Sequence, residues 1–184
     1  MPINNKQYQQ NLKKAMEMLA KDNKVIFIGQ TVEYPGSPMF GSLENVDKKK
    51  KLELPVFENT QMGISIGLAL EGFIPVSIFP RIDFLICGTD QLVNHLDKVE
   101  EMSQGEFKPG VIIRTQIGNT KPIYPGAQHC GDYTKALKLM CKNVAVHKIK
   151  DETEVIPLYK MALERAKMGL STLLVEVPTG AFGK

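Results

Sequence analysis

Apolar residues along this chain follow two repeating patterns, one typical of helices and one typical of buried strands. Near the N-terminus they recur three or four positions apart, and this spacing predicts an amphipathic helix. The residues concerned are Tyr8, Leu12, Ala15, Met16 and Leu19. The next apolar run, Val25–Ile28, is short and ends at Gly29, as is typical of a buried strand.

Further strands and helices are predicted in alternation along the rest of the chain. The strands are Phe73–Phe79, Val111–Arg114, Val144–His147 and Leu173–Val177. The helices are one that follows Glu58, Phe84–Met102, Tyr133–Lys142 and one capped by Asp151. This alternation predicts an α/β fold, with a mainly parallel twisted sheet and helices on both faces. We expect residues 1–184 to form a single domain.

Two long segments rich in glycine and proline, 30–51 and 118–131, separate the predicted elements. Loops of this length are uncommon in compact domains and are often functional. In open parallel sheets, ligands bind at the carboxyl ends of the strands. Both loops and Glu58 fall at such ends, so we expect one edge of the sheet to carry an active site.

Composition narrows the classes of function. The chain has 184 residues, 43% hydrophobic and 23% charged, with a formal net charge of +3, as in an ordinary globular protein. The basic run Lys48–Lys51 lacks interleaved aromatics, which argues against nucleic-acid binding. Three cysteines without CxxC spacing argue against disulfides and against a metal site in this chain. The N-terminus has no apolar signal core and the stretch Met62–Phe79 is interrupted, so we predict a cytoplasmic protein without a membrane span.

Glu58 is the most informative single residue. It follows the apolar segment Leu54–Phe57 and precedes a glycine-rich helix, for which Asn59 or Thr60 is the expected N-cap. A carboxylate at such a junction can share a proton with a ring nitrogen of a ligand. It can equally be a first-turn glutamate that complements the helix dipole, and the spacing alone leaves both interpretations open.

Several motifs in order give this chain a family resemblance. Pro55-Val56-Phe57-Glu58 precedes a run of spaced glycines, and the segments 90–94 (Asp-Gln-Leu-Val-Asn), 102–105 (Met-Ser-Gln-Gly) and 125–129 (Pro-Gly-Ala-Gln-His) follow. Over about four-fifths of its length, the chain resembles the N-terminal, pyrimidine-binding domain of the beta subunits of 2-oxo-acid dehydrogenases. It resembles the middle domain of transketolases more distantly. Both groups depend on thiamine diphosphate.

The resemblance implies roles for four residues. Glu58 is expected to hydrogen-bond a pyrimidine nitrogen of the cofactor and exchange a proton with it, so that the thiazolium can act as an electron sink. Phe84 is expected to stack on the pyrimidine, and His129 to act as an acid or base near the substrate. Gln30 lies beside the cofactor, where the family usually carries an acidic residue. The presence of glutamine rather than an acid at position 30 implies that a proton relay is cut or rerouted through Glu33.

The resemblance also implies a partner chain. Mg²⁺ and the cofactor diphosphate are held in this superfamily by a Gly-Asp-Gly motif with a downstream Asn, whereas here Gly131-Asp132 is followed by Tyr133. We therefore expect thiamine diphosphate at an interface with a separate diphosphate- and Mg-binding subunit, most simply in an α2β2 heterotetramer. The family's C-terminal domain is expected to be absent, because the chain stops at Lys184 just after the last strand.

The expected activity is that of a transketolase-like transferase or a 2-oxo-acid decarboxylase or dehydrogenase component. Its substrate is a ketose phosphate or a 2-oxo acid, and Arg81 is either a contact for such an anion or a structural ion-pair residue. A non-catalytic scaffold or regulatory partner with the same fold is the alternative. A Cys130–His129 nucleophile is disfavoured because nothing else completes it. A flavodoxin-like nucleotide binder is disfavoured because no phosphate loop follows the first strand.

Overall fold

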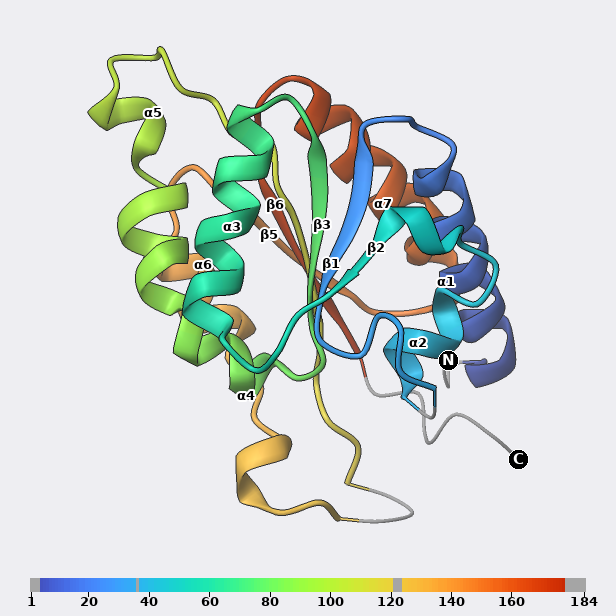
Figure 1. The fold of residues 1–184 in the computed structure, drawn as a ribbon. Helices are drawn as coiled ribbons and strands as arrows, with labels where there is room; N and C mark the ends of the chain where they lie inside the picture. The colour runs from blue at the N-terminus through green and yellow to red at the C-terminus, as the bar shows by residue number, and fades with distance from the viewer. Residues whose placement is uncertain (1–3, 36, 121–123, 178–184) are drawn as a thin grey trace.

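Six parallel strands form one sheet in the order β2-β1-β3-β4-β6-β5 (Figure 1). The strands are β1 (Val25–Gly29), β2 (Lys51–Glu53), β3 (Ile74–Phe79), β4 (Ile112–Gln116), β5 (Ala145–Ile149) and β6 (Thr172–Glu176). This computed structural model describes residues 4–35, 37–120 and 124–177. The predicted α/β fold with a parallel sheet is confirmed.

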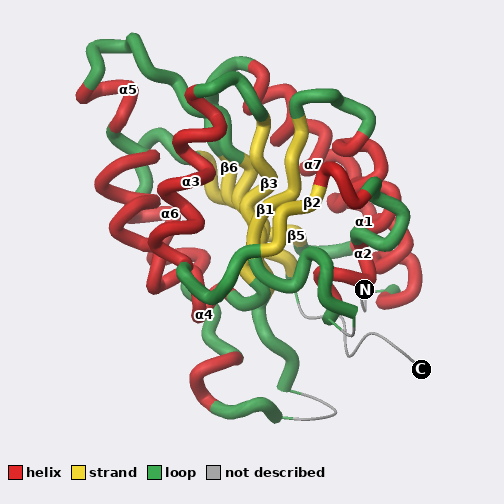
Figure 2. The backbone as a smooth tube through the Cα atoms, viewed as in Figure 1, coloured by secondary structure: helices red, strands yellow, loops and turns green. Residues whose placement is uncertain are grey.

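Helices cover both faces of the sheet (Figures 1 and 2). The helices are α1 (Asn5–Ala20), α2 (Pro38–Ser42), α3 (Glu58–Leu70), α4 (Ile82–Leu85), α5 (Val99–Met102), α6 (Thr134–Met140) and α7 (Glu152–Lys167). The helices α1, α2 and α7 lie on one face, and α3 to α6 lie on the other. Among the residues described, no helix has the length and apolar character needed to cross a bilayer.

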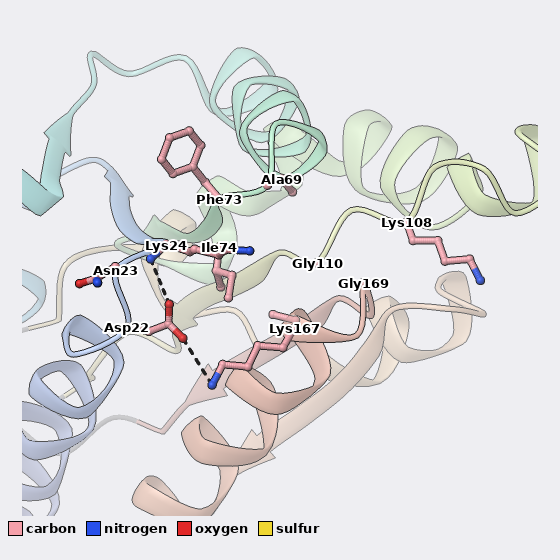
Figure 3. A pocket seen from close by; sticks show the side chains of 12 residues that line it. Asp22, Asn23, Lys24, Ala69, Phe73, Ile74, Lys108, Gly110, Lys167 and Gly169 are labelled. Carbon is pink, nitrogen blue, oxygen red and sulfur yellow. Dashed lines mark hydrogen bonds and ion pairs between the residues drawn. The ribbon is translucent and has the colours of Figure 1, made fainter.

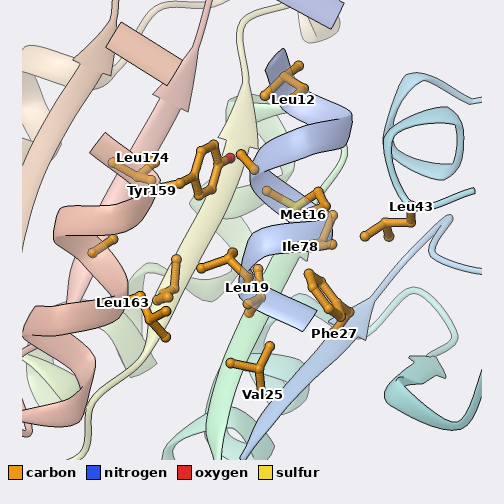
Figure 4. Packing of buried hydrophobic residues seen from close by; sticks show 14 of the residues in the cluster. Leu12, Met16, Leu19, Val25, Phe27, Leu43, Ile78, Tyr159, Leu163 and Leu174 are labelled. Carbon is orange, nitrogen blue, oxygen red and sulfur yellow. The ribbon is translucent and has the colours of Figure 1, made fainter. Parts of the chain in front are cut away.

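The two faces of the sheet bury separate hydrophobic cores. Strand side chains point alternately to opposite faces, so Ile112 packs with α1 and α7, whereas Ile113 packs with α3 and α6. Figure 4 shows the first core, where Met16 and Leu19 of α1 meet Leu163 of α7 over the strands. Burial on both faces explains why the strands read as continuous apolar runs rather than as alternating patterns.

The caps of the long helices follow from their sequences, with one exception. Asn4 accepts a hydrogen bond from the Gln7 amide at the start of α1. Asp151 caps α7 as predicted, accepting from the Thr153 amide. The predicted cap of α3 is wrong: the helix begins at Glu58, so Asn59 and Thr60 lie inside its first turn, and Phe57 occupies the capping position without a side-chain bond.

Three segments differ from the sequence prediction. The loop 30–51 contains α2 and a 3-10 turn at Lys48–Lys50, and β2 ends before Pro55, whose ring nitrogen cannot join a strand ladder. The predicted helix Phe84–Met102 is broken into α4, a 3-10 turn at Ile86–Gly88, a π-helical turn at Gln91–Leu96 and α5. It breaks near Gly88 because that residue packs tightly against the backbone of α3, where a Cβ would lie 3.1 Å from the Glu58 carbonyl oxygen.

The strand order reverses beside β1. The chain passes from β1 to β2 on one side, then returns through α3 to β3 on the other side. The carboxyl ends of β1 and β3 therefore flank a topological switch point, where ligands bind in open parallel sheets. The loops that follow β1, β3 and β4 all emerge at this edge, at the bottom of Figure 1.

Candidate active site

A cavity of about 410 Å³ lies at the carboxyl edge of the sheet. Its lining comes from the loops that follow β1, β3 and β4 and from α2 and α4: Gln30, Thr31, Ser37, Met39, Pro80, Arg81, Phe84, Gln116 and His129. Three of the predicted site residues, Gln30, Phe84 and His129, are therefore brought to one place. They come from segments as much as 99 positions apart in the chain.

Glu58 lies directly behind this lining. Its side chain is buried, with 9% exposure for the residue, and Gln30 Nε2 donates a hydrogen bond to its Oε1 at 3.2 Å. Gln30 is itself only 6% exposed. Glu58 does not line the cavity, so Gln30 separates the carboxylate from the open space. The pair places one acid and one amide at the switch point of the sheet.

The first turn of α3 positions Glu58. A network of buried polar residues anchors this turn to the sheet. Gln61 Nε2 donates to the Ile78 carbonyl oxygen at 2.9 Å and to Ser77 Oγ at 3.2 Å. Ser65 Oγ donates to the Gln61 carbonyl oxygen one turn below. Sequence reasoning missed this network, although two buried polar residues one turn apart in an apolar helix are a usable signal.

Gly29 allows this close packing. Its φ is +143°, and a Cβ there would overlap the Ile78 carbonyl oxygen and lie 2.8 Å from Gln61 Nε2. Only glycine adopts such a backbone freely while leaving room for a neighbouring strand and helix. Gly29 therefore fixes where Gln30 leaves β1, next to Glu58.

Glu53 holds the turn that follows Gln30. Its carboxylate accepts hydrogen bonds from the backbone amides of Thr31 and Val32, each at 2.7 Å, and of Glu33 at 2.8 Å. Thr31 has a φ of 60°, so these bonds stabilise a turn that a β-branched residue rarely forms alone. Glu53 was not recognised from the sequence, because its partners are backbone groups.

Among the described residues, no contact supports the alternative proton relay through Glu33. Glu33 lies 3.7 Å from Lys48 Nζ, and no hydrogen bond or ion pair links it to Glu58 among residues 4–35, 37–120 and 124–177. Its carboxylate faces a lysine at the outer side of the loop. Glu58, by contrast, accepts a hydrogen bond from Gln30 at this edge.

Phe84 and His129 form one wall of the cavity. Their ring centroids are 5.4 Å apart with planes at 85°, an edge-to-face pair. His129 Nδ1 is buried and has no hydrogen-bond partner in the part of the chain that the structure describes. Cys130 donates instead to the Asn119 carbonyl oxygen at 3.6 Å, and no contact between its sulfur and the His129 ring is seen in the described residues.

A larger cavity of about 580 Å³ lies at the opposite, amino edge of the sheet (Figure 3). Two of its charged side chains pair with each other: Asp22 lies 3.4 Å from Lys167 Nζ, and it also accepts from the Lys24 backbone amide at 3.0 Å. Both bonds hold down the pKa of Asp22, against the opposing effect of burial. The smaller carboxyl-edge cavity is the better active-site candidate, since three atoms of its lining residues, Thr31 Oγ1, Arg81 Nε and His129 Nδ1, are buried without hydrogen-bond partners in the described residues.

Sequence comparison identifies relatives over much of the chain. It is 27% identical over 180 residues to the pyruvate dehydrogenase E1 component subunit beta of Rickettsia bellii, covering 89% of this chain and 55% of the relative. It is 30% identical over 125 residues to the 2-oxoisovalerate dehydrogenase subunit beta of Pseudomonas aeruginosa, covering 65% of this chain and 35% of the relative. The chain is a homologue of the E1 beta subunits.

Solved structures share the fold of this chain. A split-gene transketolase, described as an inactive beta4 tetramer, superposes with a TM-score of 0.71 at 17% identity, over 94% of this chain and 51% of that one. This likeness establishes the fold of the thiamine-diphosphate-dependent enzymes. No family model matches the chain. The chain spans about half the length, or less, of the E1 beta subunits that it matches.

Proposed function

We propose that this chain binds and activates the pyrimidine ring of thiamine diphosphate in a two-subunit enzyme. The observation that carries the proposal is Glu58, a buried carboxylate at a switch point of the sheet, held by Gln30 beside an open cavity. The homology to E1 beta subunits supports the cofactor. A structural first-turn glutamate would gain nothing from burial next to a cavity with unpaired polar groups.

The residues around the cavity fit a flat, polar heterocycle. Phe84 and Met39 supply apolar contact, while Thr31 Oγ1 and His129 Nδ1 are buried atoms without hydrogen-bond partners in the described residues. Buried polar atoms normally find partners, so two of them at one cavity indicate a polar ligand. Phe84 is proposed to contact the ring by stacking, which orients it and adds about 1 kcal/mol beyond area burial.

Glu58 is proposed to hold and return a proton at a ring nitrogen. The bound cofactor supplies the electron sink. Gln30 donates to Oε1 and no described residue donates to Oε2, so one carboxylate oxygen is oriented and the other is available to a ligand. Because an amide is not a proton acid, Gln30 orients Glu58 without competing for its proton. His129 is proposed as the acid or base for the substrate.

A separate chain is proposed to hold the diphosphate and Mg²⁺, in an α2β2 heterotetramer in the cytoplasm. In the described residues, no group of three or more His, Cys, Asp or Glu side chains could bind a metal ion. The cysteines Cys87, Cys130 and Cys141 are all free. The substrate is proposed to be a 2-oxo acid or a ketose phosphate, acted on by decarboxylation or ketol transfer.

Replacing Glu58 by Gln tests the proposal in the assembly with its diphosphate-binding partner. The amide keeps an acceptor for Gln30 but cannot exchange the proton, so we expect kcat to fall about 10²- to 10⁴-fold with the fold unchanged. Glu71→Gln, just past the C-terminal end of α3, is the matched control and should leave kcat near wild type. Near-normal turnover of Glu58→Gln would refute the role of Glu58. Failure of the wild-type assembly to bind thiamine diphosphate would favour a non-catalytic scaffold.

A further inference from the structure

Arg81 is an unpaired cation at the same cavity. It directly follows the loop residue Pro80 after β3, and its side chain lines the cavity next to Phe84 and His129. Its Nη1 donates to the Pro80 carbonyl oxygen at 3.0 Å, while Nε is buried and has no acceptor in the described part of the chain. The guanidinium fork is therefore only partly used by the protein.

The chain has three arginines, and each of the other two bonds a side chain of the protein through its Nε. Arg114 forms an ion pair with Glu176 at 2.7 Å, and Arg165 Nε donates to Thr172 Oγ1 at 3.0 Å. Within residues 4–35, 37–120 and 124–177, no carboxylate lies within ion-pair distance of Arg81. This excludes the structural ion-pair role among the described residues.

Arg81 is half-buried without an ion pair, and this carries a cost. Burial lowers its pKa, and the nearby Cys130 and Asp83 offset this only in part. The guanidinium remains charged at any physiological pH. Asp83 is turned toward the loop instead, where its Oδ1 accepts from the Gly131 amide at 3.0 Å. A half-buried cation whose Nε–H lacks an acceptor is stabilised by an anion that enters from outside.

The space beside Arg81 is kept open by a glycine. A Cβ at Gly118 would lie 3.2 Å from Arg81 Nε and would overlap the His129 carbonyl oxygen. A side chain at position 118 would thus crowd the unpaired Nε–H. Within the described residues, Arg81 is also the only arginine or lysine that lines the cavity, so they supply one positive charge there, which matches a monoanion better than a dianionic phosphate.

We propose that Arg81 binds the carboxylate of a 2-oxo-acid substrate and so selects 2-oxo acids over ketose phosphates. The inference rests on the proposed function, since it assigns the substrate of the same site. The planar guanidinium can offer Nε–H and an Nη–H to the two oxygens of a carboxylate. Binding there places the adjacent keto group inside the cavity, near His129.

Nitrogen-15 NMR of the arginine Nε–H groups in the full chain tests this binding without any cofactor. We expect pyruvate to shift the Arg81 signal, while the signals of Arg114 and Arg165 stay in place. Methyl pyruvate, its neutral ester, should shift none. The inference is overturned if pyruvate moves no arginine signal, if the ester moves Arg81 equally, or if inorganic phosphate shifts Arg81 at lower concentration than pyruvate does.

Kinetics of the assembled enzyme give a second readout. Arg81→Gln should lower kcat/KM for pyruvate about 30- to 100-fold, mainly through KM, and change that for methyl pyruvate less than about threefold. Arg165→Gln is the control and should leave both unchanged. Arg81→Gln should bind thiamine diphosphate normally. Weakened cofactor binding by this variant overturns the inference. A wild-type assembly that is inactive and binds no cofactor contradicts the proposed function instead. In that case the NMR result decides whether Arg81 binds a carboxylate.

Discussion

At the scale of single residues, the contact between Gln30 and Glu58 orients the carboxylate of the candidate site. The Gln30 amide donates to the Glu58 carboxylate at 3.2 Å in a buried setting. Charge-assisted bonds of this kind are worth about 1.5–3 kcal/mol, enough to hold one carboxylate rotamer. A glutamate at position 30 would place its carboxylate as close to the Glu58 carboxylate as the Gln30 amide now lies.

Gln30→Glu should destabilise the chain in a pH-dependent manner. Two adjacent buried carboxylates repel, and we expect a loss of about 1–3 kcal/mol in the free energy of unfolding at pH 8. Lowering the pH to 5 should recover part of this loss, because one proton can be shared between the acids. Urea unfolding at both pH values measures the difference. Gln128→Glu, at an exposed position, is the control, and an equal loss at both pH values would contradict the prediction.

At the scale of elements, the sequence predicts the long helices and central strands well. The spacing of apolar residues identifies α1 and α7 because each buries one face against the sheet. It fails at 84–102, where local packing against α3 breaks the helix into short turns. For the site, Glu58, Phe84 and His129 were found through motifs. The supporting residues Gln61 and Glu53 were not, because they bond to backbone groups of other segments.

The contact between β1 and α3 depends on Gly29. Gly29→Ala forces a Cβ against the Ile78 carbonyl oxygen in a backbone region that alanine avoids, so we expect a loss of about 2–4 kcal/mol in stability. Gly67→Ala within α3 is the matched control: its Cβ meets nothing, and alanine should stabilise the helix by about 0.5–1 kcal/mol. Thermal unfolding of both variants tests this. Equal changes in stability for the two variants would contradict the claim that the close packing at β1 requires Gly29.

At the scale of the whole molecule, a buried ion pair joins the sheet to the helices of one face. Arg114 of β4 bonds Glu176 of β6 through Nε at 2.7 Å and Nη2 at 3.3 Å, and its Nη1 donates to Ser42 Oγ of α2. Tyr159 of α7 donates to Glu176 Oε1 at 2.6 Å. Because α2 also supplies Met39 to the cavity, this network connects the core to the candidate site.

Removing one member of this ion pair should lower the free energy of unfolding substantially. Arg114→Met leaves Glu176 buried without its cation, and we expect a loss of about 3–5 kcal/mol. The double variant Arg114→Met with Glu176→Leu should recover much of that loss, because no charge then remains uncompensated. Guanidinium chloride unfolding gives both values. A double variant less stable than Arg114→Met alone would contradict this account of the network.

The position of the cofactor ring relative to Glu58 is the most direct test of the central claim. The measurement is an experimental structure of the assembly formed with the diphosphate-binding chain and thiamine diphosphate. We predict a Glu58 carboxylate oxygen within hydrogen-bonding distance of a pyrimidine nitrogen, about 2.6–3.2 Å, with Phe84 against the ring. A pyrimidine ring bound away from Glu58, or an assembly whose sites hold no cofactor, would contradict the claim.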